Sequence, residues 1–217
     1  MQPIGVFDSG LGGISVWKEV VKLLPNESFI YFADSGHCPY GEKPHDEIRR
    51  MSEYITRFLI EKGCKIIVIA CNTASAVAGT LVKKMAGKQM PVVNVIDPTS
   101  AYVASKFNEG KIGVIATKAT VNSRIYAKRI TALNEQLKVT MLATPLLVSM
   151  VEEGFFNNNI SQAIINDYLS RTNLKGVSGL ILGCTHFPLI KLEVQRFYTD
   201  KTEVIDSTEI VANFTKE

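Results

Sequence analysis

The chain has 217 residues, of which 46% are hydrophobic, so it can form one large domain or two small ones with a substantial core. Its 24 basic and 21 acidic residues give a net charge of +3, and Lys and Arg do not cluster with aromatic residues, which argues against nucleic-acid binding. The sequence has neither a signal-peptide pattern nor an apolar run near the roughly 18 residues of a membrane-spanning helix. We therefore expect a soluble cytoplasmic protein with no nucleic-acid or membrane partner.

Apolar runs alternate with amphipathic segments along nearly the whole chain. The apolar runs predict strands at residues 4–7, 28–33, 65–70, 92–96, 111–116, 139–143, 179–182 and 204–205. The amphipathic segments predict helices near residues 13–24, 45–62, 74–85, 99–107, 122–133, 145–153, 160–170 and 188–197. This alternation predicts an α/β fold with mainly parallel sheets flanked by helices.

The segment at residues 96–99 predicts a boundary between two α/β domains. Pro98 disfavours a helical conformation at Asp97, and Thr99 could cap the helix that follows. We expect residues 1–96 to form an N-terminal domain, joined by residues 208–217, and residues 97–207 to form a second domain. Each half repeats the same local order of apolar strand, cysteine, polar residues and helix. Two such domains facing each other would bring both cysteine motifs to one cleft.

Two cysteines stand directly after buried-strand patterns, where open α/β sheets bind their ligands. These motifs are Cys71 followed by Asn72 and Thr73, and Cys184 followed by Thr185 and His186. Two thiols at two strand ends suggest a reaction that needs a pair of acid/base groups. Inversion of a stereocentre is one such reaction.

The neighbours of the two cysteines suit acid/base chemistry. A helix N-terminus stabilises a thiolate and lowers a thiol pKa that starts near about 8.5, while the resting protonation of each thiol stays open. His186 could hold or relay a proton near Cys184, and Asp8 could do the same near Cys71, although a hydrogen-bonded core histidine is the alternative for His186. The neutral donors for a substrate carboxylate are Asn72, Thr73 and Thr185.

Polar loops follow the first two predicted strands. Residues 8–13, Asp-Ser-Gly-Leu-Gly-Gly, leave amides free at a helix start, which suits carboxylate binding or simple turn formation. They match neither the dinucleotide fingerprint nor the P-loop. Residues 34–41 are rich in hydrogen-bond donors and favour a binding role over a plain turn.

The four cysteines contain no Cys-x-x-Cys pair, so neither a zinc site nor a thioredoxin-like redox centre is supported. Cys64 fits a small buried apolar residue, whereas the role of Cys38 stays open. A thiol oxidoreductase is therefore disfavoured.

Taken together, the motifs resemble those of bacterial glutamate racemases, in the cofactor-independent aspartate/glutamate racemase superfamily. The matching stretches are residues 5–13, 33–34, 39–41, 70–75, Thr117 with Thr120, 151–154 and 182–189, in order from the first strand to near the end of the chain. The sequence departs from the family pattern in three ways. Thr144 stands before Pro145 where many relatives have Cys, and Thr208 follows Ser207 where Gly is usual. The chain ends at Glu217, whereas relatives continue beyond this point.

The resemblance implies two α/β domains with the active site in the cleft between them. It implies that Cys71 and Cys184 are the acid/base groups on opposite faces of the substrate Cα. Asp8 would assist Cys71, while His186 and Glu152 would assist Cys184. By the same match, the residues that hold the amino acid would be Ser9, Tyr40, Gly41, Asn72, Thr73, Thr117, Thr120 and Thr185.

The implied activity is the interconversion of L- and D-glutamate without a cofactor or a metal, supplying D-glutamate for peptidoglycan. We expect a small-molecule substrate and a homodimer. The alternatives are a racemase with aspartate or broad specificity, since the cysteine pair serves the whole superfamily, and a catalytically impaired shorter member that acts as a binding protein.

Overall fold

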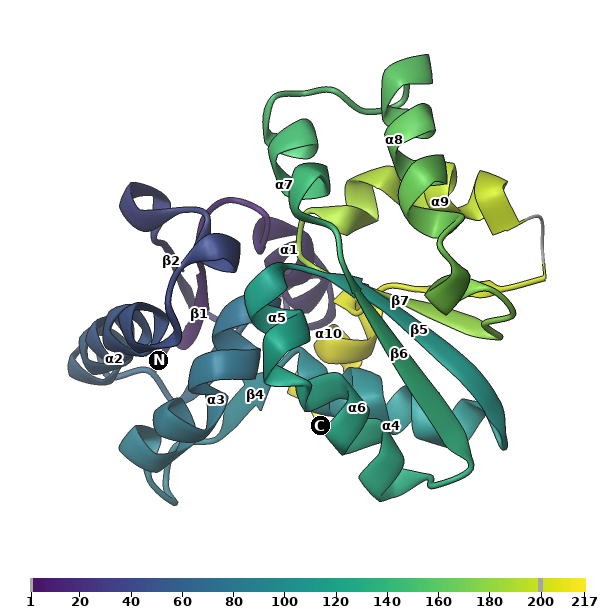
Figure 1. The fold of residues 1–217 in the computed structure, drawn as a ribbon. Helices are drawn as coiled ribbons and strands as arrows, with labels where there is room; N and C mark the ends of the chain where they lie inside the picture. The colour runs from purple at the N-terminus through teal and green to yellow at the C-terminus, as the bar shows by residue number, and fades with distance from the viewer. Residues whose placement is uncertain (1, 199–200) are drawn as a thin grey trace.

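The computed structural model describes residues 2–198 and 201–217 and contains two four-stranded parallel sheets (Figure 1). The first sheet has the order β2-β1-β3-β4 and consists of β1 (Ile4–Asp8), β2 (Phe29–Ala33), β3 (Ile66–Ile69) and β4 (Val92–Asn94). The second has the order β6-β5-β7-β8 and consists of β5 (Gly110–Ala116), β6 (Leu137–Ala143), β7 (Gly179–Gly183) and β8 (Glu203–Ile205). The predicted α/β fold class is confirmed.

Helices flank both sheets. The α-helices are α1 (Ile14–Leu23), α2 (His45–Glu61), α3 (Asn72–Ala86), α4 (Ile96–Lys106), α5 (Lys118–Ser123), α6 (Ile125–Leu133), α7 (Pro145–Glu152), α8 (Asn159–Leu169), α9 (Lys191–Tyr198) and α10 (Thr208–Lys216). Short 3₁₀ helices occur at η1 (Ser35–His37), η2 (Tyr40–Glu42), η3 (Thr172–Leu174) and η4 (Phe187–Ile190). Among the described residues, the structure contains no helix that combines the length and the apolar content needed to cross a membrane.

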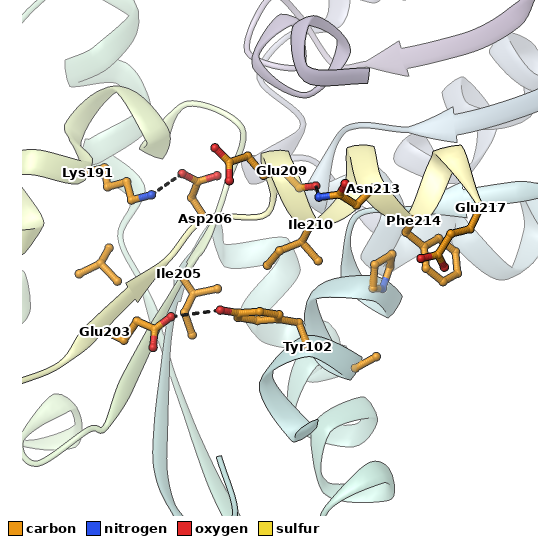
Figure 2. Close-up of a pocket in the computed structure, with 13 residues that line it drawn as sticks. Tyr102, Lys191, Glu203, Ile205, Asp206, Glu209, Ile210, Asn213, Phe214 and Glu217 are labelled. Atoms are coloured by element: carbon orange, nitrogen blue, oxygen red, sulfur yellow. Dashed lines mark hydrogen bonds and ion pairs between the residues drawn. The ribbon is translucent and has the colours of Figure 1, made fainter. Parts of the chain in front are cut away.

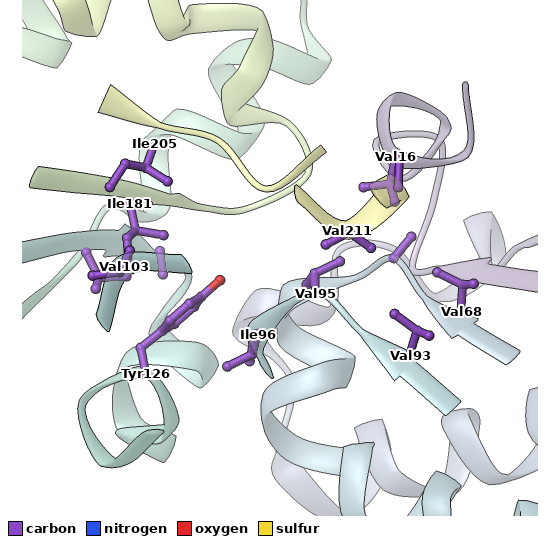
Figure 3. Packing of buried hydrophobic residues seen from close by; sticks show 14 of the residues in the cluster. Val16, Val68, Val93, Val95, Ile96, Val103, Tyr126, Ile181, Ile205 and Val211 are labelled. Atoms are coloured by element: carbon purple, nitrogen blue, oxygen red, sulfur yellow. The ribbon is translucent and has the colours of Figure 1, made fainter. Parts of the chain in front are cut away.

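The central apolar cluster joins the two sheets. Buried side chains of the first sheet, such as Val68, belong to the same cluster as Val114 and Ile181 of the second sheet (Figure 3). Helix α10 closes this region because its Val211 packs into the cluster beside Val16 of α1. A continuous core of this kind holds the facing sheet ends in a defined relation.

The observed helices depart in places from the predicted ones. The predicted helix at 122–133 is divided into α5 and α6 by Arg124, whose φ of 55° is left-handed. Residues 208–216 form α10, for which the sequence pattern suggested no element. The domain boundaries stay a prediction.

The expectation that Pro98 keeps Asp97 out of a helix was wrong. Helix α4 begins at Ile96, because the Asn94 side chain accepts hydrogen bonds from the amides of Ile96 at 3.0 Å and Asp97 at 2.9 Å. Pro98 lies in the first turn, where a missing N–H costs nothing. Thr99 is not the cap, since its hydroxyl donates to a backbone carbonyl at 2.6 Å.

Candidate active site

One small cavity lies where the carboxyl ends of β1, β3, β5 and β7 meet. Its volume is about 20 Å³, and the predicted site residues that line it are Ser9, Tyr40, Gly41, Cys71, Asn72, Thr73, Thr117, Cys184, Thr185 and His186. Pro39 and Val148 also line it and were not predicted. The expectation that the two cysteine motifs meet at one cleft is thus confirmed, because both thiols line the same cavity.

Cys71 occupies the N-cap position of α3. Its Sγ accepts a hydrogen bond from the Ala74 amide at 3.4 Å and lies 3.7 Å from the Ser9 Oγ. Burial and the charge of Asp8 raise the pKa of Cys71 to about 12, although these donors oppose the rise. The thiol is therefore protonated at neutral pH in the free protein.

Cys184 follows β7 and contacts His186. Its Sγ lies 3.6 Å from His186 Nδ1, and His186 Nε2 lies 3.2 Å from an oxygen of Glu152. Burial raises the pKa of Cys184, and the charges of Cys71, Asp8 and Glu152 reinforce the rise. The segment after Cys184 forms the 3₁₀ helix η4 rather than an α-helix N-terminus.

The lowering of the thiol pKa that a helix N-terminus predicts is therefore outweighed at both cysteines. The helix N-terminus at Cys71 does favour the thiolate, as expected, but desolvation outweighs the donors of Ala74 and Ser9. At Cys184 the His186 backbone amide stabilises the thiolate, but this contribution is too small to offset burial.

Asp8 is fully buried behind the cavity at the end of β1. Its Oδ2 accepts hydrogen bonds from the amides of Gly10 at 3.1 Å and Gly13 at 3.0 Å, which fixes the glycine-rich loop around the carboxylate. Its Oδ1 lies 3.5 Å from the Thr185 hydroxyl of the second motif. Burial raises the pKa of Asp8, although the two amides oppose this, so the carboxyl can hold a proton above the usual range of an aspartic acid.

Three threonine hydroxyls form a chain across the junction of the two sheets. Thr73 from α3 lies 2.9 Å from Thr117 at the end of β5, and Thr117 lies 3.1 Å from Thr120. Gly41 is in close contact with this chain, because a Cβ at that position would lie 2.7 Å from the Thr117 side chain. The chain supplies neutral hydrogen-bonding groups beside both thiols.

Comparisons with known proteins identify the family of the chain. A model of the Asp/Glu/hydantoin racemase family matches residues 4–215. The chain belongs to this racemase family. It is 40% identical to the glutamate racemase of Geobacter metallireducens, over 99% of this chain and 78% of that protein.

Solved structures agree with this assignment. The crystal structure of Francisella tularensis glutamate racemase in complex with D-glutamate matches with a TM-score of 0.92 and 39% identity, over 99% of this chain and 79% of that one. Glutamate racemase from Bacillus anthracis matches with a TM-score of 0.89 and 33% identity, over 99% of this chain and 80% of that one. The predicted enzyme class, an isomerase of the racemase type, is confirmed by these relatives.

Three of the predicted racemase site residues lie behind the cavity wall rather than on it. Asp8 contacts Thr185, Glu152 contacts His186 and Thr120 contacts Thr117, each through the side chain. They can act on a bound molecule only through residues that line the cavity, and for Asp8 these include Cys71 as well as Thr185. This arrangement suits the assisting part that the resemblance implies for Asp8 and Glu152.

Four contacts around this cavity are not predicted by the sequence motifs. Asp34 accepts a hydrogen bond from the Tyr40 hydroxyl at 2.5 Å and lies 2.7 Å from His37. Cys38 donates to the same Glu152 oxygen that faces His186, at 3.3 Å. The presence of Asp34 in a motif that matches the family was a usable signal. The contact between Asn72 and Tyr126 of α6 had no such signal.

Another hollow of about 430 Å³ lies between β8, α4 and α10 (Figure 2). Its lining includes the ion pair of Lys191 with Asp206 at 2.8 Å and the contact of Tyr102 with Glu203 at 3.3 Å, but neither cavity thiol. We therefore place the chemistry at the smaller cavity. Within residues 2–198 and 201–217, no group of three or more His, Cys, Asp or Glu side chains is arranged to hold a metal ion.

Proposed function

We propose that this chain is a glutamate racemase, which interconverts L- and D-glutamate through Cys71 and Cys184 and supplies D-glutamate for peptidoglycan. The main support is that one thiol from each half of the molecule lines the same cavity, among neutral hydrogen-bond donors. The relatives at about 40% identity are named glutamate racemases, and one similar structure contains D-glutamate.

The proposed reaction needs two groups because inversion requires a proton to leave one face of Cα and return to the other. The thiolate on one face takes the α-proton and becomes a thiol, while the electron pair of the Cα–H bond moves into the substrate carboxylate. The thiol on the other face then gives its proton to Cα and becomes a thiolate. A single base would tend to return the proton to the face it came from.

The raised thiol pKa values define what the assisting residues must do. With a pKa of about 12, forming the Cys71 thiolate at pH 8 costs about 5 kcal/mol. Asp8, whose own pKa is raised, is placed to accept that proton within the protein. The pair of His186 and Glu152 would serve Cys184 in the same way, so neither thiol depends on solvent as the base.

Stabilising the carbanion is the second requirement. An α-hydrogen beside a carboxylate is a weak acid, and fixed donors around the carboxylate lower the barrier most when water is excluded. Asn72, Thr73 and Thr185 would donate to this carboxylate, while Ser9, Tyr40, Gly41, Thr117 and Thr120 would complete the pocket. A cavity of about 20 Å³ holds about one water molecule, so we expect the residues that line the cavity to move apart to admit substrate.

The test is incubation of the protein with L-glutamate or L-aspartate in D2O without pyridoxal phosphate, following optical rotation and deuterium at Cα. We expect glutamate to racemise with deuterium incorporation, and Cys71→Ala or Cys184→Ala to abolish racemisation. Cys64→Ala, which removes a buried thiol outside the cavity, is the control.

Each other outcome identifies a different function. Inversion of aspartate in preference to glutamate would indicate the alternative specificity. Glutamate binding without exchange would indicate a binding protein. Full activity in either cavity-thiol variant would refute the two-thiol mechanism. A homodimer and a cytoplasmic location remain predictions, and light scattering would test the first.

A further inference from the structure

Tyr126 of α6 is a buried phenol that makes a polar contact across the molecule. Its hydroxyl donates to Asn72 Oδ1 at 2.7 Å, and thus joins a helix packed on the second sheet to the first turn of α3 on the first. Tyr126 is 0% exposed, and Figure 3 shows its hydroxyl pointing away from α6 into the space between the two halves. Burial raises the pKa of Tyr126, so the phenol keeps its proton and remains the donor.

This hydrogen bond determines which way the Asn72 amide faces. The oxygen of an asparagine side chain accepts hydrogen bonds and the nitrogen donates them, so a donor held at the oxygen fixes both ends. Asn72 is 2% exposed and lines the cavity, and its Nδ2 has no hydrogen-bond partner among the described residues. A buried amide nitrogen without a partner is costly, unless a bound group satisfies it.

We propose that Tyr126 is a positioning residue for substrate binding, which holds the Asn72 NH₂ group toward the cavity so that it donates to a substrate carboxylate. This inference rests on the proposed racemase function. Without the phenol, the Asn72 amide could rotate by half a turn and present its oxygen to the same carboxylate. The contact also makes the carboxylate site depend on both halves, since the phenol and the amide belong to helices that pack on different sheets.

The local backbone explains how Tyr126 reaches this position. Arg124, with a φ of 55°, ends α5 and starts α6, so the chain changes direction two residues before the phenol. The Ser123 hydroxyl accepts from the Ile125 amide at 3.2 Å and supports the new helix start. The side chain of Tyr126 is thereby directed to α3 rather than along a continuous helix.

Tyr126→Phe tests the proposal, because it keeps the ring that fills the core and removes only the hydroxyl. We expect KM for glutamate to rise about tenfold and kcat to change by less than about threefold, as befits the loss of one oriented donor. The equilibrium Kd for D-glutamate, measured by calorimetry, should rise by the same factor. Tyr102→Phe is the matched control, since Tyr102 bonds Glu203 outside the cavity, and it should leave KM unchanged.

A double-mutant cycle separates positioning from general stability. Asn72→Ala alone should raise KM by about 30-fold or more, and adding Tyr126→Phe should then change KM by less than about twofold. An equal effect of Tyr126→Phe in both backgrounds, or a lower melting temperature with an unchanged KM, would overturn the proposal. If the unmodified protein neither racemises nor binds glutamate, the proposed function itself fails. If it does both and Tyr126→Phe behaves identically, only this inference fails.

Discussion

Replacing Asp8 by Asn isolates the proton-accepting part of this residue from its structural part. Asp8 Oδ2 accepts from the amides of Gly10 and Gly13 at 3.1 and 3.0 Å, and an asparagine carbonyl oxygen can accept both. The new NH₂ group would then face the Thr185 hydroxyl, which lies 3.5 Å from Asp8 Oδ1 and can accept a hydrogen bond. The loop should therefore keep its shape while the carboxylate is lost.

The raised pKa of Cys71 sets the size of the effect. A pKa of about 12 leaves about one thiol in ten thousand ionised at pH 8, which is the greatest loss expected if nothing replaces Asp8 as the proton acceptor. Asp→Asn also removes a negative charge that raises the pKa of Cys71, so the loss should be smaller than this limit. We expect kcat/KM to fall by about 10²–10⁴ at pH 8. Because the equilibrium constant of racemisation is 1, kcat/KM must fall equally in both directions.

The pH profile is the decisive assay for Asp8→Asn. Without the internal acceptor, the Cys71 proton must leave to solvent before the reaction, so kcat/KM of the variant should rise about tenfold per pH unit between pH 7 and pH 10. The kcat/KM of the unmodified enzyme should change less over this range, so the gap in kcat/KM between the variant and the unmodified enzyme should narrow as the pH rises. A gap that stays constant across this range would refute the view that Asp8 accepts the Cys71 proton.

The stability of the Asp8→Asn variant gives an independent readout. The folded-state pKa of Asp8 is raised above its ordinary value of 3.8, so the folded protein binds more protons than the unfolded chain in the window between these two values. The contribution of Asp8 to stability is therefore fully present below pH 3.8 and is lost as pH rises through the folded-state pKa. We expect the variant to melt at a higher temperature than the unmodified protein at pH 8, with the difference vanishing near pH 4. A lower melting temperature at both pH values would show that the carboxylate is needed for the fold.

Two further substitutions test how the halves meet. Gly12→Ala would place a Cβ 2.7 Å from the Thr185 hydroxyl, so we expect kcat/KM to fall at least about tenfold and the free energy of unfolding to fall by about 1–3 kcal/mol. Gly36→Ala is the control, because its Cβ would meet no neighbouring residue within 4 Å, and neither the activity assay nor calorimetry should show a change. Lys118→Ala removes an exposed ion pair with Glu42 at 2.7 Å, and should cost less than about 1 kcal/mol of unfolding free energy and leave kcat within about twofold. A tenfold change in kcat would instead mean that this pair controls opening.

The positions of the two cavity thiols could be predicted from the sequence because they depend on short-range patterns. A buried parallel strand leaves its carboxyl end at the sheet edge, and Cys71 and Cys184 each stand at such an end. The start of α4 shows the limit of the same approach. Pro98 predicts that the helix starts after Asp97, but the Asn94 side chain supplies the capping oxygen and the helix starts earlier.

The protonation of the thiols could not be predicted, because it depends on residues distant in the sequence. Desolvation of Cys71 requires the whole cavity to be assembled, and the charge that adds to it comes from Asp8. The contact of Tyr126 with Asn72 had no sequence signal either, since a tyrosine in an amphipathic helix is typical of a core residue. Sequence patterns predict which strand end a residue occupies, whereas side-chain pairing across two sheets follows only from packing.

In the proposed reaction, the two cavity thiols play symmetric parts but have unlike neighbours. Cys71 has a helix amide and the carboxylate of Asp8, while Cys184 has His186 and, behind it, Glu152. The conversion of L- to D-glutamate and its reverse pass through the same two proton transfers in opposite order. An equilibrium constant of 1 therefore does not require equal barriers at the two thiols. Both thiols share a pKa raised by burial, and the proposed mechanism gives each of them an acceptor that keeps the proton inside the protein. The burial that makes each thiolate costly would also strengthen the donors around the carbanion, so the proposed mechanism needs the assisting residues for the same reason that it needs the buried cavity.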